Sequence, residues 1–206
     1  MIHNYAVRLA AIIAGELKMN ERQGIIAYGL EIIIGAWVKL ILFVTLPLAL
    51  GIFPQVAAAA LASGIFRLAA GGAHCTAYYR CLVSSLVTFL GIGALSRYLA
   101  AYSLPLETIV ICVTAWSLVI VWCWAPADTP AKPIVSLLHH KGLRIASLII
   151  VAFYLVTGLY IPLKPDLVLA ASLGFFIQAF TITPAGYRFI GIVDRLLSRQ
   201  ITPCRD

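Results

Sequence analysis

The chain of 206 residues is 62% hydrophobic and 11% charged, and it carries a formal net charge of +7. Soluble domains are about 45–50% apolar and about 25% charged, so this composition excludes a water-soluble globular domain. The apolar runs are long and continuous rather than alternating, which predicts membrane-spanning helices instead of a transmembrane barrel. We expect the positive charge to face anionic lipid at the inner membrane surface, and we expect no nucleic-acid partner.

The first 24 residues predict an amphipathic helix that lies in the membrane interface. On a helical wheel one sector is polar and holds Asn4, Arg8, Lys18 and Arg22. The opposite sector is apolar and holds Ile2, Tyr5, Leu9, Ile12, Ile13 and Leu17. Charges among the apolar positions argue against a signal peptide, so an interfacial helix over 1–24 is the expected structure.

Six apolar segments follow, and we expect about six transmembrane or re-entrant helices in an all-α fold. They are placed at 25–50, 53–70, 82–100, 104–124, 143–163 and 167–185. The second segment is short, because only 56–66 is uninterruptedly apolar, and it could be short, tilted or part of a re-entrant structure. Its alanine-rich run predicts a surface that lets helices approach closely in lipid.

Basic residues set the expected orientation. With the amino terminus inside, the inner segments hold Arg8, Lys18, Arg22, Arg67, Arg80, Lys132, Lys141, Arg144, Arg188, Arg195, Arg199 and Arg205. The outer loops hold only Arg97 and Lys164, so both termini are predicted to be cytoplasmic in a multi-pass cell-membrane protein. The whole chain, 1–206, is predicted to be one membrane domain. It comprises membrane-embedded helices over 25–185 and a cytoplasmic tail over 186–206, in which residues 187–200 form a second interfacial helix.

Charged groups near membrane depth are few: Glu31, Lys39 and Glu107. Such charges can mark function, or they can snorkel to the interface or pair with a neighbouring helix. The five cysteines show neither a disulfide framework nor zinc-ligand spacing, so reduced thiols and no metal or other cofactor are expected.

One stretch, 67–85, combines residues that can carry chemistry. A thiol is a poor nucleophile at neutral pH until a base or a cationic neighbour raises its thiolate fraction. His74 can be that base for Cys81, and Arg67 and Arg80 can add positive potential. On one straight helix, His74 and Cys81 would stand two turns apart, roughly 10 Å along the axis. The helix must therefore bend or break between them if they act together, since a general base needs contact at about 3 Å.

Other residues of this stretch leave alternatives open. Gly71 and Gly72 allow a positive φ or a close backbone approach, which could bring amides near a developing oxyanion. Cys75 is a rival nucleophile because it is adjacent to the histidine, although on a helix its side chain would point away. Ser84 and Ser85 lack a nearby lysine or acid to complete a serine site.

This pattern resembles the signature of the AgrB family, the accessory gene regulator membrane peptidases of Gram-positive quorum sensing. The matching positions are Arg67, Gly71, Gly72, His74 and Cys81. The later segment 125–134 resembles the proline-rich inner loop of that family, and chain length and the apolar segments also fit. The resemblance implies that Cys81 and His74 are the catalytic pair, and that Arg67 and Gly72 occupy positions needed for activity.

The resemblance also implies a reaction and its partners. Family members cut an autoinducing-peptide precursor through an acyl-enzyme thioester and promote its closure to a thiolactone or lactone. The expected partners are this precursor, membrane lipids and a second copy of the chain in a homodimer. Candidate substrate contacts are Asp128, Lys132 and Arg80, and no third catalytic residue is evident.

Two other functions remain open on the residues alone. A non-enzymatic peptide transporter or exporter would explain the spans and the charges near membrane depth, but not the Gly-Gly-His-Cys cluster. A structural or assembly subunit would use the alanine-rich second segment for helix contacts.

Overall fold

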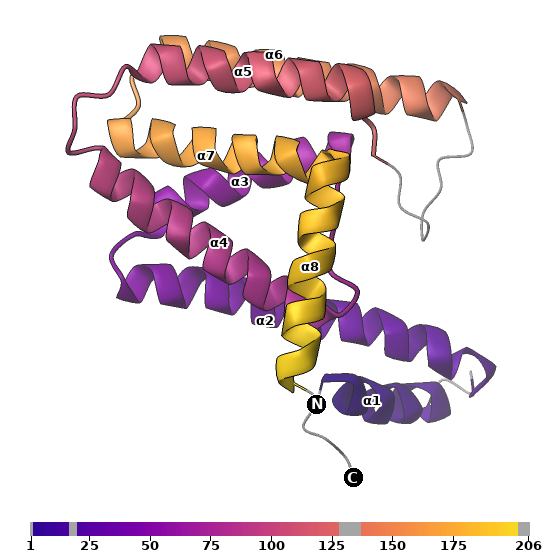
Figure 1. Ribbon diagram of the computed structural model, residues 1–206. Helices are drawn as coiled ribbons and strands as arrows, with labels where there is room; N and C mark the ends of the chain where they lie inside the picture. The colour runs from indigo at the N-terminus through magenta and orange to yellow at the C-terminus, as the bar shows by residue number, and fades with distance from the viewer. Residues whose placement is uncertain (1, 17–19, 128–136, 202–206) are drawn as a thin grey trace. The chain divides into compact units, whose positions relative to one another are not determined.

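The computed structural model describes residues 2–16, 20–127 and 137–201 (Figure 1). These residues form the helices α1 (Ile2–Glu16), η1 (a 3-10 helix, Asn20–Arg22), α2 (Gln23–Ala49), α3 (Phe53–Ala70), α4 (Tyr78–Leu99), α5 (Leu106–Trp124), α6 (Leu137–Tyr160), α7 (Pro165–Ile182) and α8 (Pro184–Ile201). Within the described ranges the backbone contains no strand, only an isolated bridge between Gly71 and Ala127. The predicted all-α fold is confirmed.

Six helices, α2 to α7, are long and apolar enough to cross a membrane, as the sequence predicts. The second predicted segment is a continuous helix of 18 residues, so no re-entrant turn interrupts it. The third begins at Tyr78 rather than at residue 82, which places Cys81 inside the helix. The predicted interfacial helix over 1–24 is wrong in extent, because α1 ends at Glu16 and α2 already begins at Gln23.

The chain divides into two compact units, Met1–Leu46 and Pro47–Asp206, and each is described by itself. The first unit holds α1, η1 and most of α2. Exposed large apolar side chains on α1 match the predicted lipid-facing sector: Tyr5, Leu9, Ile12 and Ile13. On α2 the Lys39 ammonium lies 5.5 Å from the centre of the Phe43 ring, and Glu31 is half-buried. The prediction of one membrane domain stays a prediction.

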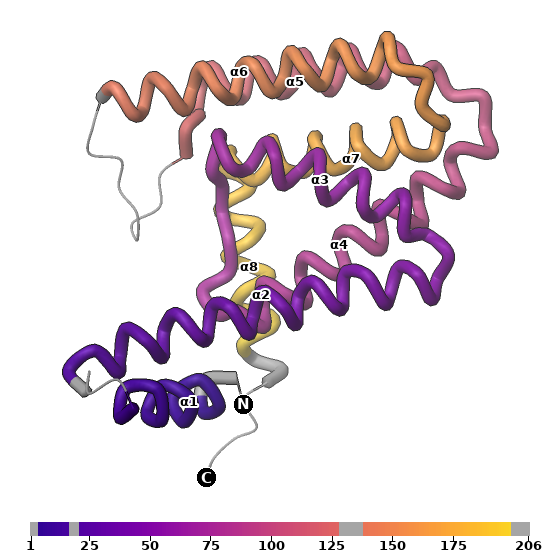
Figure 2. Tube along the Cα trace, turned by 180° about the vertical axis from the view of Figure 1, so that it is seen from behind, coloured from indigo at the N-terminus to yellow at the C-terminus, as the bar shows by residue number. Residues whose placement is uncertain are grey.

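In the second unit α3 and α7 form the most extensive helix pair (Figures 1 and 2). They approach closely at Gly174, where a Cβ atom would collide with the main chain of Ala59. Ala59 belongs to the alanine-rich run and is fully buried. The predicted small-residue contact surface is therefore confirmed, because only small side chains allow two backbones to come this near.

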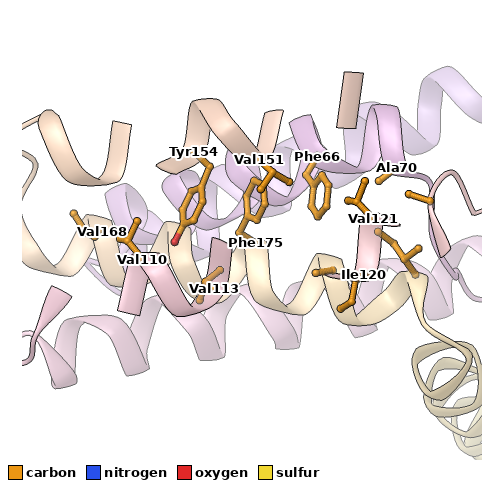
Figure 3. Close-up of a cluster of buried hydrophobic side chains, with 13 residues drawn as sticks. Phe66, Ala70, Val110, Val113, Ile120, Val121, Val151, Tyr154, Val168 and Phe175 are labelled. Atoms are coloured by element: carbon orange, nitrogen blue, oxygen red, sulfur yellow. The ribbon is translucent and has the colours of Figure 1, made fainter. Parts of the chain in front are cut away.

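Three stacked rings fix the inner helices of this unit (Figure 3). Phe175 of α7 lies between Phe66 of α3 and Tyr154 of α6, and both pairs of ring centroids are 4.4 Å apart. The Tyr154 hydroxyl donates to Ser172 Oγ at 2.7 Å, so the buried polar end of the ring is satisfied. These contacts hold α3, α6 and α7 together.

Candidate active site

The predicted break between His74 and Cys81 is present. Helix α3 ends at Ala70 and α4 begins at Tyr78, and residues 72–75 between them form no regular secondary structure. His74 is exposed on this segment. Cys81 is half-buried in the first turn of α4. The two residues therefore do not share a straight helix, and the main geometric objection to their acting together is removed.

Both glycines at the start of the segment are required by their conformation and by close contacts. Gly71 has φ 73° and Gly72 has φ 131°, backbone angles that residues other than glycine rarely adopt. A Cβ atom on Gly71 would collide with the carbonyl oxygen of Ala127, which lies just after α5. One on Gly72 would lie 2.6 Å from Thr181 Oγ1 of α7. The Gly71 amide already donates to the Arg67 carbonyl at 2.9 Å.

Arg67, in the last turn of α3, binds the main-chain carbonyl groups of the segment that carries His74. Its Nη2 donates to the carbonyl oxygens of Gly72 at 3.2 Å and Ala73 at 2.7 Å, and its Nη1 donates to Gln178 Oε1 at 3.3 Å. Gln178 in turn donates to the Gly71 carbonyl at 2.7 Å. The guanidinium also lies within electrostatic range of the Cys81 thiol. Arg67 thus shapes the His74 segment and brings positive charge toward Cys81.

The main chain adds two more attachments between neighbouring helix ends. The Ala73 amide donates to the Thr181 carbonyl at 3.0 Å, and the Ala127 amide donates to the Ala70 carbonyl at 2.9 Å. The ends of α3, α5 and α7 therefore meet at the segment that carries His74 (Figure 1).

The imidazole of His74 is oriented by the main chain of the following residue. Its Nδ1 lies 3.1 Å from the Cys75 carbonyl oxygen. Because a carbonyl only accepts hydrogen bonds, this contact favours the neutral tautomer with the proton on Nδ1. The lone pair is then on Nε2, which is the atom that can take a proton from a thiol.

Asp194 of α8 is the acid that sequence reasoning missed. Its Oδ1 accepts from the Thr76 amide at 3.2 Å and its Oδ2 from the Thr76 hydroxyl at 2.8 Å. Arg80 Nη1 forms an ion pair with the same Oδ2 at 3.0 Å. The hydrogen bond from the Thr76 hydroxyl is the main cause of a lowered pKa for Asp194, although burial opposes it. The side chain is therefore a carboxylate at neutral pH.

Cys75, the rival nucleophile, is 7% exposed. Burial raises the pKa of its thiol, and the nearby Cys81 and Asp194 side chains raise it further. A raised pKa means less thiolate at neutral pH, and the thiolate is the reactive form.

We therefore expect Cys75 to be slow to alkylate in a variant whose other cysteines are replaced by serine. Iodoacetamide should label it at least about tenfold more slowly than a small-molecule thiol at pH 7.5. The rate should climb at pH values above the range around 8.5 in which an ordinary cysteine titrates. Mass spectrometry of timed samples measures this, and labelling as fast as the small thiol would contradict it.

The remaining candidates are less informative. Asp128 and Lys132 lie outside the described residues. Glu107 is exposed in the first turn of α5, where a carboxylate is favoured by the helix dipole. Among the described residues no group of three His, Cys, Asp or Glu side chains could hold a metal ion.

A shallow cavity of about 240 Å³ adjoins the site beside Ala127. Its walls are mainly apolar and aromatic and come from Trp124, Pro126, Ala127, Ile182, Pro184 and Tyr187. It is smaller than the roughly 300–1,000 Å³ pockets that hold drug-sized ligands, so it has room for little more than one side chain.

These features define a helical multi-pass membrane protein with an imidazole and a thiol on either side of a helix start. Residues 6–182 match the family described as accessory gene regulator B, and the chain belongs to this family, AgrB. Members of the family act on an autoinducer precursor peptide in the membrane.

Two relatives from Clostridium perfringens support this placement. The chain is 30% identical over 159 residues to AgrB-like protein 2 of strain 13, covering 75% of this chain and 74% of that protein. It is 27% identical over 214 residues to an AgrB-like protein of strain SM101, covering 98% of this chain and all of that protein. No solved structure matches the chain.

Proposed function

We propose that this chain is a membrane-embedded cysteine endopeptidase that cuts an autoinducer precursor and promotes its cyclisation, with Cys81 as nucleophile and His74 as base. The observation that carries the proposal is the helix break, because it removes His74 and Cys81 from one straight helix. Cys75, the residue next to His74, lies within electrostatic range of Cys81, so the segment and the first turn of α4 are near neighbours.

The first step forms a thioester. His74 Nε2 takes the thiol proton while Cys81 Sγ attacks the scissile carbonyl carbon on the carboxyl side of the future ring. The first amides of a helix have no acceptor within the helix, and the helix dipole is positive there. The start of α4 can therefore stabilise the developing oxyanion together with Arg67. As the C–N bond breaks, His74 returns the proton to the leaving amine, and the carboxyl-terminal peptide departs.

The second step releases a ring. A cysteine of the bound precursor attacks the acyl-enzyme thioester, so that one thioester replaces another and the Cys81 thiol is regenerated. Because the exchange is close to balanced in energy, no ATP is needed. A serine in the precursor would give a lactone by the same route. A site that excludes water protects the acyl-enzyme thioester, which water would otherwise hydrolyse before the ring closes.

The surroundings of the site suit such a substrate. Basic side chains at this end of the second unit would attract an acidic precursor tail, and Arg188 and Arg195 of α8 are both exposed. The small apolar cavity beside Ala127 could take one side chain next to the scissile bond. Asp128 and Lys132 remain candidates for substrate contact, and a homodimer remains the proposed assembly.

Trapping the acyl-enzyme tests the proposal. The protein in lipid nanodiscs is incubated with its cognate precursor, identified as a short peptide encoded beside the gene, in which the ring-forming cysteine or serine is replaced by alanine. Blocking cyclisation should leave a covalent adduct with the mass of the amino-terminal fragment. Peptide mapping should place it on Cys81, and hydroxylamine should remove it.

The matched control is Cys75→Ala, which should form the same adduct. An adduct on Cys75 of the wild-type protein would show that Cys75, and not Cys81, is the nucleophile. Cleavage of the precursor without any adduct on the protein would argue against covalent catalysis altogether.

A further inference from the structure

A single carboxylate of α8 holds the chain on both sides of the turn that leads from His74 to Cys81. Asp194 accepts two hydrogen bonds from Thr76, at 3.2 and 2.8 Å, although the residues are 118 positions apart in the sequence. It also pairs with Arg80 at 3.0 Å. Thr76 is two residues after His74, and Arg80 immediately precedes Cys81.

The start of α4 lacks a capping side chain, and Arg80 Nη1 donates locally to Thr76 Oγ1 at 3.2 Å. Ala77, the residue before the first turn of α4, has an extended backbone with φ −111° and ψ 140°. The side chain at this position forms no capping hydrogen bond with the helix. Good caps are serine, threonine, aspartate and asparagine at that position. Asp194 supplies from another helix the negative charge that favours a helix start. The direction in which α4 leaves the turn is therefore fixed partly by α8.

The other side of His74 is anchored independently. Ala73 is held by the Thr181 carbonyl at 3.0 Å and by Arg67 at 2.7 Å, which attaches it to α7 and α3. The histidine thus follows an attachment to α3 and α7 and precedes an attachment to α8. Removing the Asp194 carboxylate takes away two Thr76 bonds and the ion pair with Arg80 without touching the imidazole or the thiol; the Arg80 bonds to Thr76 Oγ1 and to the Asp194 carbonyl, at 3.2 and 3.4 Å, remain.

We propose that Asp194 is a positioning residue: by binding Thr76 and Arg80 it sets the distance and angle between His74 and Cys81. The inference rests on the proposed function. Asp194 is not a third member of a catalytic triad, because its oxygens bind Thr76 and Arg80 whereas His74 Nδ1 faces the Cys75 carbonyl. It acts through the main chain and touches no reacting atom.

The test is the kinetics of precursor cleavage by the full-length protein in nanodiscs, comparing Asp194→Ala and Asp194→Asn with wild type. A displacement of about 1 Å between reacting groups can cost roughly a hundredfold in rate. We expect kcat to fall about a hundredfold for alanine and about tenfold for asparagine, which keeps one acceptor oxygen, with KM within about threefold. Ser198→Ala is the matched control on α8, since Ser198 Oγ bonds the carbonyl of Arg195 in its own helix; its kcat should match wild type.

A double-mutant cycle separates positioning from general damage. Thr76→Val keeps the shape of the side chain and the amide bond to Asp194 Oδ1, but it removes the hydroxyl bonds to Asp194 Oδ2 and Arg80 Nη1, and it should lower kcat by about tenfold. Combined with Asp194→Ala, it should add little further loss, because both changes break the same connection. Additive losses would mean that the two residues act separately, and would overturn the inference.

Each remaining outcome decides the matter. Wild-type kcat in Asp194→Ala overturns the inference. If Asp194→Ala fails to accumulate, the test rests on Thr76→Val alone. An unchanged kcat in Thr76→Val then overturns the inference. If Cys81→Ala is inactive while Asp194→Ala is fully active, only this inference fails. If Cys81→Ala cleaves normally, the proposed function fails first.

Discussion

Replacing Cys81 with alanine is expected to reduce precursor cleavage to background while the protein still accumulates in the membrane. Removing the nucleophile of a hydrolase can cost about a millionfold in kcat. The alanine should not disturb α4, because the Cys81 amide keeps its hydrogen bond to the Ala77 carbonyl at 3.1 Å. His74→Ala should lose about a hundred- to ten-thousandfold, the usual contribution of a general base.

The measurement is co-expression with the cognate precursor, followed by mass spectrometry of the cleaved peptide. Cys75→Ala is the matched control, since it removes a neighbouring thiol of the same segment and should retain activity. A Cys81→Ala protein that binds precursor but does not cut it would separate binding from chemistry. Unchanged cleavage in both the Cys81 and His74 variants would refute the peptidase proposal.

The second large effect is expected for Arg67→Met. Methionine keeps much of the length and the apolar stem, but it removes three hydrogen bonds from a charged donor. Bonds to charged groups contribute about 1.5–3 kcal/mol each, and the carbonyls of Gly72 and Ala73 would lose their donor. We expect cleavage to fall at least about a hundredfold, because the segment that carries His74 is no longer held.

Arg67→Lys should not restore activity, since a single ammonium cannot reproduce the planar fork that reaches several acceptors. Arg97→Met provides a matched control. Arg97 donates to the Gly51 carbonyl at 2.7 Å, at the opposite ends of α3 and α4 from the site. Cleavage assays and hydrogen exchange of the amides of 72–76 measure both effects. Equal losses in Arg67→Met and Arg97→Met would show that the loss of an arginine from the bundle, and not of this contact, is responsible.

The spans could be predicted because long apolar runs identify membrane helices directly. The helix break followed from a condition on the site, since His74 and Cys81 would stand two turns apart on one straight helix. The predicted helix ends were less accurate. Helix α4 begins at Tyr78, four residues before the expected residue 82, because its first turn includes Tyr78 and Tyr79, which precede the apolar run. Weak caps leave little in the sequence to mark such a boundary.

The connections between distant segments could not be predicted in the same way. Gln178 lies 107 residues from Gly71, and Asp194 lies 118 residues from Thr76. Each did carry a signal. Gln178 is a polar residue inside an apolar span, which often marks a functional position. Asp194 is the one acid among the arginines of 187–200. Neither signal names the residue that it contacts, because only the packing of α7 and α8 against the segment decides that.

The length of α3 has a consequence for how the substrate is found. Its 18 residues rise about 27 Å, slightly less than the roughly 30 Å hydrocarbon core of a bilayer. If α3 spans the membrane, the chain leaves the helix at Gly71 near the level of the lipid headgroups. We therefore expect the enzyme to meet precursor molecules that are already adsorbed to the membrane. The rate of cleavage would then depend on the number of precursors per area of membrane and not on their number per volume of cytosol. Adding lipid at a fixed amount of precursor would lower that surface density.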